Sequence, residues 1–459
     1  MADADADADT DAGGPLARRV QRLLRRLVEV RPDEVGPLVA AFAFFFCLLA
    51  AYYLLRPLRD ALGLAGGVGN LPWLFSATFV VMLAAVPAFG ALAARLPPRR
   101  FVPIVYRFFA ASFVGFAALL AAGTAPVAVG RAFFVWISVF NLFVVSVFWS
   151  VLADRFDNAQ ARRLYGFIAA GGTAGTLAGP ALAALLAPRL DPQALTLAAV
   201  LLLEAAVQCF RRLDRGRAPP AGQGGRVADG MPVGGGARPA DDGRLGGGAI
   251  AGITLIARSR YLQGMALYLL LGTVTATLLY VEQGRIVADR FADTASRTQF
   301  FAQVDLAVSA LTLVLQTAVV GRLLRRLGVA TALMALPAAV VAAFALVALA
   351  PGPAALAVAQ MLRRATEYAV ARPAREVLYT VVGREAKYKA KAVIETVVYR
   401  GGDAATGWLA TALGAAGVGF QALALAVLPL AAGWAALGVW LGRRQDERLA
   451  RRGPADGEP

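Results

Sequence analysis

Twelve long runs of apolar residues constrain the fold of this chain more than any other feature of its sequence. Each run is close to the roughly 20 residues that an α-helix needs to cross the hydrocarbon core of a bilayer. Helices suit that environment because all their backbone hydrogen bonds are satisfied internally. The runs cover residues 36–55, 71–94, 101–122, 127–152, 164–187, 192–210, 261–281, 298–320, 329–350, 354–381, 393–415 and 419–441. The sequence therefore predicts an all-α membrane protein with twelve transmembrane helices.

Composition supports this prediction and excludes several classes of protein. Apolar residues make up 58% of the chain and charged residues 17%, which is unlike a soluble domain. The formal charge of +16 could indicate nucleic-acid binding, but the basic residues lie in short connections between apolar runs, so we expect a bilayer and no nucleic acid as the partner. The first run begins after the mid-thirties and no small-residue cleavage site follows a run, so we expect no removable signal peptide.

The residue types that usually hold metals or cofactors are scarce. The chain has no histidine, and its two cysteines, Cys47 and Cys209, fall inside apolar runs. No nucleophile–base set, metal cluster or phosphate-binding P-loop is present in the sequence. We therefore expect no enzymatic activity, no disulfide, no metal and no bound cofactor.

The basic residues gather in every second connection and so predict the orientation of the chain. RLPPRR, DRFDNAQARR, GRLLRRLG and GREAKYKAK all fall on one side of the predicted membrane, whereas AGTAP, APGP and GAAGVG on the other side have no basic residue. Basic connections stay in the cytoplasm. We expect both termini to be cytoplasmic.

The chain divides into five predicted parts. Residues 1–33 combine a disordered acidic segment with a basic amphipathic helix, which would lie on an anionic membrane surface or be a solvated soluble helix. Residues 34–212 form a first six-helix half, and residues 213–258, rich in Gly, Pro, Ala and Asp, form a flexible cytoplasmic linker. Residues 259–442 form the second half, and residues 443–459 form a basic tail.

The second half repeats the first at a shift of about 230 residues. GALAARLPPRR (90–100) corresponds to GRLLRRLG (321–328), and a Gly-Gly pair occurs in both the fifth and the eleventh run. This layout resembles the major facilitator superfamily. The resemblance implies that the first and fourth spans of each half line a central cavity.

Charged residues inside apolar runs are the main functional signal. An ionised side chain in hydrocarbon costs several kcal/mol unless it meets a partner or a watery cavity. The acidic residues at such positions include Glu204, Glu282, Asp305 and Glu395, but basic residues outnumber possible partners, and Arg131 and Arg364 are expected to be left unpaired. The candidate substrate-binding residues on the cavity-lining spans are Arg56, Arg59, Arg131, Asn141, Trp149, Arg285, Arg363, Arg364, Glu367, Tyr368 and Arg372.

A second set of charged residues is predicted to form ion pairs or gates. Its members are Asp60, Asp154, Arg375, Glu376, Arg400 and Asp403. Helical spacing predicts the pairs Arg363/Glu367, Arg372/Glu376 and Arg400/Asp403. Pro373 is expected to kink its helix and free a backbone carbonyl near the cavity. Structural explanations stay open: Arg56, Arg59 and Arg131 could reach lipid headgroups, and Trp149 could simply pack.

Three segments carry a closer resemblance. LYTVVGREAKYKAKAVIETVVYRGGDAATGW (378–408), YYLLRPLRDALG (52–63) and FWSVLADRFDNAQARRLYGFIAAGGTAGTLAG (148–179) are similar to the ATP/ADP translocase family of intracellular bacteria and plastids. Within it, they resemble the nucleotide exchange transporter-like proteins of free-living bacteria. The resemblance makes Arg59 and Asp60 a basic–acidic pair. It makes the only lysines of the chain, Lys387, Lys389 and Lys391, part of a cytoplasmic motif that would steer a polyphosphate or anchor on anionic lipid.

These observations leave three hypotheses open. The leading one is a monomeric secondary transporter of an organic or phosphorylated anion in a bacterial inner membrane. Exchange of one nucleotide for another is one version of this hypothesis. The second is a proton-coupled facilitator with Glu367, Glu376 or Asp403 as the proton carrier. The third is a lipid-handling or sensory membrane protein that has the same fold without transport.

Overall fold

The computed structural model describes residues 30–31, 34–215 and 249–452. The predicted N-terminal helix, residues 216–248 of the predicted linker and residues 453–459 of the tail lie outside the described residues. The first half consists of six helices in chain order: α2 (Val35–Gly63), α3 (Leu71–Arg95), α4 (Pro98–Ala121), α5 (Pro126–Arg155), α6 (Asn158–Leu186) and α7 (Pro192–Arg215). A 3₁₀ turn, η2 (Val68–Asn70), precedes α3.

The second half has more elements because several of its helices are interrupted. Its long helices are α9 (Arg260–Arg290), α10 (Thr294–Leu315), α11 (Gly321–Leu349), α12 (Pro353–Thr366), α15 (Tyr399–Ala415) and α16 (Phe420–Arg452). The shorter helices are α8 (Ala249–Arg258), α13 (Arg372–Leu378), α14 (Arg384–Val393) and the 3₁₀ turn η5 (Tyr379–Val381). Three π-helical turns join them: η3 (Gln316–Val320), η4 (Glu367–Ala371) and η6 (Ile394–Val398).

The predicted twelve crossings are confirmed. Nine helical stretches of the described chain are long and apolar enough to cross a bilayer. One of them, Thr294–Leu349, reverses direction at Gly328, whose φ of 75° suits glycine, and therefore crosses twice. Residues 353–381 and 394–415, each containing a π-helical turn, supply the remaining two crossings.

Two expectations about connections change. Residues 321–328 are not a loop, because the helix continues to a single reversal at Gly328. Residues 249–258, within the predicted linker, form α8, whose Gly252 lies against the backbone of Lys389 in α14. A substituent at Gly252 would meet the Lys389 carbonyl oxygen at 2.7 Å, so the two helices pack directly on one another.

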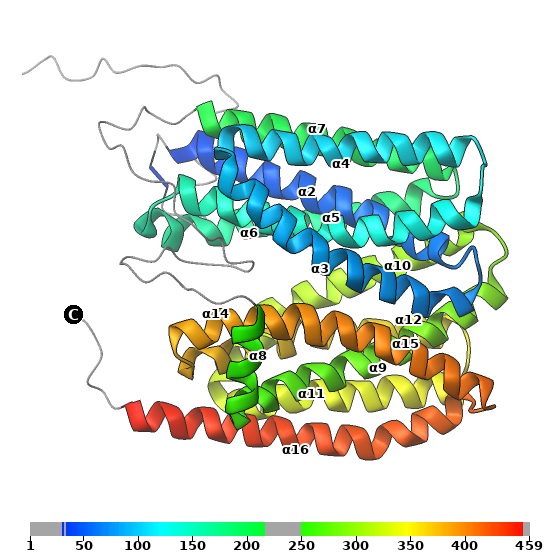
Figure 1. Ribbon diagram of the computed structural model, residues 1–459, viewed down its shortest axis with the longest axis vertical. Helices are drawn as coiled ribbons and strands as arrows, with labels where there is room; N and C mark the ends of the chain where they lie inside the picture. The colour runs from blue at the N-terminus through cyan, green and yellow to red at the C-terminus, as the bar shows by residue number, and fades with distance from the viewer. Residues whose placement is uncertain (1–29, 32–33, 216–248, 453–459) are drawn as a thin grey trace, which may run out of the picture.

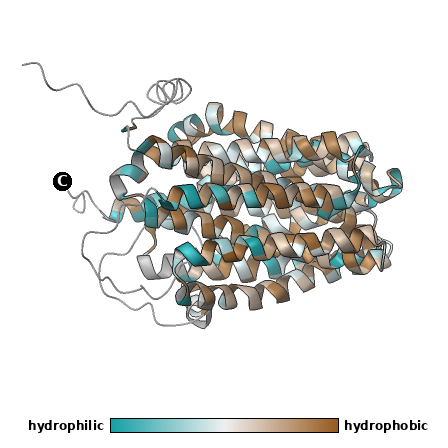
Figure 2. Ribbon diagram, turned by 90° about the horizontal axis from the view of Figure 1, so that it is seen from above, coloured by the Kyte–Doolittle hydropathy of each residue, from teal (hydrophilic) through white to brown (hydrophobic). Residues whose placement is uncertain are grey.

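Figure 1 shows α2 and α4–α7 in one group and α9, α11, α15 and α16 in a second, with α3 and α10 between them. α3 packs on α15, and α10 packs on both α2 and α6, so these two helices carry much of the contact between the halves. The end of the bundle with the turns at residues 96–97, 156–157, 328 and 382–383 is called the basic end below. The other is called the opposite end. Figure 2 shows apolar residues along most of each helix, with hydrophilic residues near the ends and at some positions in the middle of the bundle.

Small residues allow the closest packing inside the first half. A methyl group added at Gly175 of α6 would lie 2.6 Å from the carbonyl oxygen of Phe46 in α2, and one at Gly179 would lie 2.7 Å from that of Ala50. Such close backbone approach is typical of membrane helices, where van der Waals contact rather than the hydrophobic effect holds helices together. The glycines of α6 therefore bring its backbone into direct contact with α2, the helix that carries Arg56 and Arg59.

The motif that follows α5 also has a structural role. Asp157 caps α6 by accepting a hydrogen bond from the backbone of Gln160 at 2.8 Å, and the Gln160 side chain accepts one back from the Asp157 backbone. This capping box satisfies backbone groups at the start of the helix. Gln160 also donates to Glu34 at the start of α2 at 3.0 Å, which ties the two helices together at the basic end.

Candidate functional site

Arg56 and Arg59 project from α2, seven and four residues before its end. Both side chains are 13% exposed. Arg59 binds the neighbouring Asp60 at 2.6 Å, and its guanidinium lies 4.8 Å from the centre of the Phe134 ring on α5. Asp60 also accepts a hydrogen bond from the Tyr280 hydroxyl of α9 at 2.9 Å. The predicted Arg59/Asp60 pair is therefore present, and it bonds directly to the second half.

Asp305 of α10 connects arginines from both halves. Its Oδ1 lies 2.7 Å from Arg364 of α12 and 3.5 Å from Arg56 of α2. Asp305 is 2% exposed, and its Oδ2 is buried without a hydrogen-bond partner among the described residues. A single carboxylate thus bridges two guanidinium groups in the interior, where charges that lack partners are costly.

Arg363 and Arg364 lie near the middle of the bilayer, because they are ten and eleven residues after the start of α12, or about 15 Å along its axis. Arg363 donates to Gln360 at 3.3 Å, and Gln360 in turn donates to Gln283 of α9. The Nε of Arg363 and the Nε and Nη2 of Arg364 are buried with no hydrogen-bond partner within the described chain. Buried donors of this kind are normally satisfied. They are available to a ligand.

These residues form one group with an excess of positive charge. We call Arg56, Arg59, Arg363 and Arg364 the central arginine cluster; electrostatic interactions link its members to one another and to Asp305. Asp60 and Asp305 are the two carboxylates paired with them. Four guanidinium groups against two carboxylates leave two positive charges uncompensated. Such a site favours an anion, and guanidinium groups can bind carboxylate or phosphate through two parallel hydrogen bonds.

Aromatic side chains border the cluster. Tyr53 lies beside Arg56, whose guanidinium is 5.8 Å from the ring centre. Tyr368, at the start of the second part of the tenth crossing, interacts electrostatically with Arg56, Arg363 and Arg364. The two tyrosines provide ring faces and hydroxyl groups next to the unpaired arginine donors.

The backbone beside Tyr368 follows from Pro373. In the π-helical turn η4, the backbone N–H of Arg372 bonds to the carbonyl of Glu367, five residues earlier. Pro373 has no N–H, so the carbonyl of Tyr368, five residues before it, lacks the corresponding donor. The side chain of Gln316 donates to this carbonyl at 3.5 Å instead. The predicted irregularity at Pro373 and the freed carbonyl are confirmed.

The ion pairs nearer the basic end differ from two of the three predictions. Glu367 pairs with Arg375 at 2.9 Å rather than with Arg363. Glu376 pairs with Lys391 at 2.8 Å rather than with Arg372. Helical spacing permits a pair on one helix, but it does not fix the partner. The π-helical turn rotates the residues that follow it, which changes the partner of Glu367. The packing of α14 brings Lys391 beside Glu376. The predicted pair Arg400/Asp403 is present at 3.5 Å, and Asp403 also accepts a hydrogen bond from Thr277 at 2.8 Å.

The remaining candidate residues make their hydrogen bonds and ion pairs, among the described residues, with partners outside the central arginine cluster. Arg131 is exposed near the start of α5 and donates to Asn70, and Arg285 pairs with Glu282 at 3.3 Å. The prediction that Arg364 is unpaired is also corrected, since Asp305 binds it, and Arg363 is the member with no ion pair among the described residues.

Trp149 packs against Phe45, Phe148 and Tyr165, which is consistent with the packing alternative. Asn141 is half-buried on α5, and Asp154 is exposed at the basic end of the same helix. Arg372 is exposed and interacts electrostatically with Glu395. Lys389 is half-buried on α14, and the Lys387 side chain lies outside the described residues.

The two halves are joined at the opposite end. There, the Tyr280–Asp60 bond is accompanied by a hydrogen bond of 3.0 Å from Trp408 of α15 to Ser76 of α3. Gln299 of α10 donates to the backbone of Ala184 in α6 at 3.4 Å. Figure 1 shows the helices of the two halves converging at this end and separating towards the end where α7 finishes and α14 lies.

Sequence reasoning placed Asp305 among the intramembrane acids but not in the site. Its position as an isolated acid in an otherwise apolar run was the available signal. Gln283, Gln360 and Tyr53 carried no comparable signal, because neutral polar residues are tolerated in membrane helices. Their role emerges only from their neighbours across the fold.

No family model matches the chain, and no curated protein matches it. Solved structures do share its fold. The nucleoside transporter NupG has a TM-score of 0.58 at 13% identity, with 91% of this chain and 99% of that chain covered. An auto-inhibited POT family peptide transporter has a TM-score of 0.56 at 14% identity, with 92% and 98% covered. A bacterial homologue of the human lysosomal transporter Spinster, solved inward-facing and unoccupied, has a TM-score of 0.53 at 13% identity, with 92% and 94% covered. The chain is thus a multi-pass membrane protein with the all-α, two-repeat fold of major facilitator transporters.

Proposed function

We propose that this protein is a secondary active transporter of an organic or phosphorylated anion and that the central arginine cluster binds the anion. The observation that supports it is the charge imbalance of the cluster: four guanidinium groups, largely shielded from solvent, meet two carboxylates, and three of their nitrogen donors have no partner within the described chain. An anion would satisfy those donors and reduce the excess charge.

Phosphate esters are the preferred class of substrate. Arg363 and Arg364 are adjacent in sequence and hold their free donors in a desolvated site, an arrangement that suits an anion with several oxygens. Tyr53 and Tyr368 beside them offer faces on which a planar base could stack. A nucleotide combines both features, which agrees with the sequence resemblance to nucleotide exchange transporters.

Alternating access follows from the position of the cluster between the halves. Arg56 and Arg59 belong to the first half and Arg363 and Arg364 to the second, so a bound anion would contact both. The Tyr280–Asp60 and Arg56–Asp305 contacts join the halves in the state described. A ligand drives a conformational change only by binding two states unequally. An anion that draws the arginines of the two halves together changes the balance between this state and one that is open at the opposite end.

Exchange of one anion for another requires no proton carrier, and this favours exchange over proton coupling. The three carboxylates of the proton-coupled alternative all have cationic partners: Glu367 has Arg375, Glu376 has Lys391 and Asp403 has Arg400. Protonation of any of the three carboxylates would break its ion pair. We also propose, from the distribution of basic residues, that the basic end faces the cytoplasm of a bacterial cell.

The test is counterflow in liposomes that contain the purified protein. Vesicles loaded with unlabelled nucleotide should take up labelled nucleotide faster than vesicles loaded with buffer, and collapse of the pH gradient should leave the rate unchanged. Sugar phosphates and dicarboxylates in the same assay define the substrate class.

Arg363→Gln is the matched variant, because it removes the cluster member that has no ion pair. Loss of a hydrogen bond to a charged group should weaken apparent affinity about 10- to 100-fold. The control is Arg107→Gln, which removes a half-exposed arginine paired with Glu204 at 2.8 Å and should leave uptake within about twofold. Equal loss in both variants, or no uptake of any anion by the native protein, contradicts the proposal. Uptake that stops when the pH gradient collapses supports the proton-coupled alternative.

A further inference from the structure

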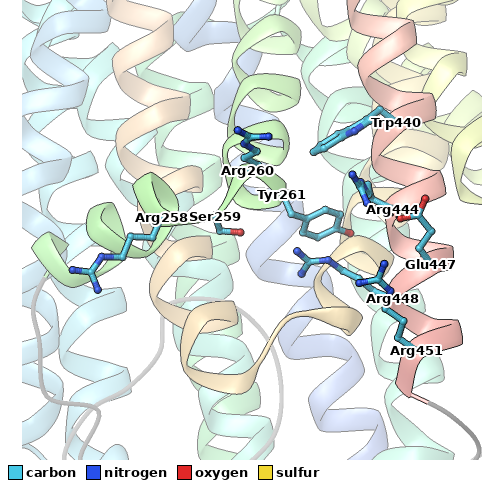
Figure 3. Close-up of a pocket in the computed structure, with 9 residues that line it drawn as sticks. All are labelled: Arg258, Ser259, Arg260, Tyr261, Trp440, Arg444, Glu447, Arg448 and Arg451. Atoms are coloured by element: carbon cyan, nitrogen blue, oxygen red, sulfur yellow. Dashed lines mark hydrogen bonds and ion pairs between the residues drawn. The ribbon is translucent and has the colours of Figure 1, made fainter.

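A hollow of about 330 Å³ lies at the basic end between the start of α9 and the end of α16, away from the central arginine cluster. Its lining includes five arginines: Arg258 and Arg260 at the junction of α8 and α9, and Arg444, Arg448 and Arg451 on α16. Figure 3 shows the α16 arginines beside Tyr261, whereas the side chain of Arg258 extends away from them. The three α16 arginines follow an i, i+4, i+7 spacing, which places them on one face of the helix. We call this set of residues, with Tyr261 and Trp440, the basic-end pocket.

The basic-end pocket has a large excess of positive charge. Its one acidic lining residue, Glu447, lies 2.8 Å from Arg444. Five arginines against this carboxylate leave four positive charges uncompensated. The Arg448 guanidinium lies 4.4 Å from the centre of the Tyr261 ring, and the Tyr261 hydroxyl donates to the backbone carbonyl of Leu378 at 3.0 Å. Arg448 and Tyr261 are therefore held in place at the base of the pocket before any ligand arrives.

The pocket lies where the membrane-spanning parts of α9 and α16 end. Trp440 borders it, and tryptophan is enriched at the boundary between hydrocarbon and water. Exposed apolar residues occur on the same elements, with Ile253 on α8 51% exposed and Leu449 on α16 48% exposed. Clusters of basic residues next to a membrane helix attract anionic headgroups. The combination fits a ligand that carries a phosphate and reaches the pocket along the membrane surface.

We propose that the basic-end pocket is a second anion site that binds a phosphate group, carried by an anionic phospholipid or by a soluble phosphate ester. Arg444, Arg448 and Arg451 from α16 donate to the phosphate oxygens, and Arg258 and Arg260 add positive charge where α8 meets α9. Bound phosphate links α16 to the start of α9. The site is independent of transport at the central arginine cluster.

The test compares thermal unfolding of the purified full chain in a neutral detergent with added phosphatidylglycerol, phosphatidylcholine or inorganic phosphate. Phosphatidylglycerol should raise the unfolding temperature more than phosphatidylcholine if a lipid supplies the phosphate. If inorganic phosphate raises the unfolding temperature and phosphatidylglycerol raises it no more than phosphatidylcholine does, the ligand is a soluble phosphate. No stabilisation by either phosphate source overturns the proposal.

The variant is Arg444→Gln with Arg451→Gln, two exposed residues whose removal leaves the Arg448–Tyr261 contact intact. The apparent affinity for phosphate should fall about tenfold or more. The matched control is Arg322→Gln with Arg326→Gln, also exposed and at the basic end, with the same loss of charge. An equal fall in the control shows a diffuse surface effect and overturns the site. The part of the phosphate response that the double variant loses should persist in Arg363→Gln, which separates this proposal from the proposed function.

Discussion

The two halves contribute two arginines each to the same cluster, yet they hold them in different ways. Arg56 and Arg59 flank Pro57 on α2, which stays α-helical throughout and packs closely on α6 through Gly175 and Gly179. Arg363 and Arg364 lie in the last turn of α12, and the π-helical turn η4 follows directly. All three π-helical turns of the described chain lie in the second half. Each arginine of the first half has a carboxylate partner, whereas the unsatisfied donors belong to the second half.

This difference indicates a division of roles. The first half presents its arginines on a continuous α-helix, and the second half presents them next to a backbone that departs from α-helical geometry. π-helical turns are frequent at functional sites, where the extra residue lets a helix change its hydrogen-bond register. We expect the second half to adjust when an anion binds, and the following predictions test this comparison from the largest expected effect to the smallest.

Asp305→Asn should have the largest effect, because it removes the carboxylate that joins the halves. Arg56 and Arg364 would then be buried without a charged partner. Loss of one member of a buried ion pair costs about 3–5 kcal/mol. The free energy of unfolding in detergent should fall by about that amount, and added anionic substrate should restore more stability to this variant than to the native protein.

Glu204→Gln is the control for Asp305→Asn. It breaks a first-half ion pair whose side chains are 44% and 41% exposed, so it should change stability by less than about 1 kcal/mol. Comparable losses in the two variants would show that burial between the halves does not distinguish Asp305.

Pro373→Ala should have an intermediate effect and act on the second half alone. The new backbone N–H can bond to the Tyr368 carbonyl in place of Gln316, and a backbone hydrogen bond contributes about 0.5–1.5 kcal/mol. Hydrogen exchange across residues 367–378 should slow and anion counterflow should decrease several-fold. Pro180→Ala in α6 is the control from the first half, and it should leave counterflow unchanged. If counterflow is as fast in Pro373→Ala as in the native protein, the hypothesis that η4 adjusts during transport is wrong.

Glu34→Gln should have the smallest effect. Burial raises the pKa of Glu34, but hydrogen bonds from the Arg31 backbone, Arg163 and Gln160 outweigh burial and hold this pKa below its ordinary value of 4.5. A carboxyl with a lowered folded pKa stabilises the fold above its unfolded pKa and loses that contribution as the pH falls. The native protein should therefore exceed the variant in unfolding temperature above about pH 4.5, and the difference should disappear at lower pH. A constant difference at all pH values contradicts the role of the charged form.

The sequence was sufficient to predict the fold but only part of the site. Run length and the alternation of basic connections depend on the bilayer, which acts on each segment locally, so the twelve crossings could be counted one at a time. The Arg400/Asp403 pair was predictable because the partners are three residues apart on one helix, and the Arg59/Asp60 pair was implied by the resemblance of residues 52–63. The pairs Arg363/Glu367 and Arg372/Glu376 failed because a π-helical turn changes which residues share a face.

By itself, the sequence determined that this chain is a helical membrane protein with more arginine in its spans than its acids can neutralise, since both properties depend on composition within short segments. The tertiary structure decided which arginines keep free donors. Asp305 lies 249 residues from Arg56 and 59 from Arg364, and it meets both only when α10 packs between the halves. The choice of partner for a buried charge depends on distance in space, and the order of residues along the chain does not specify that distance.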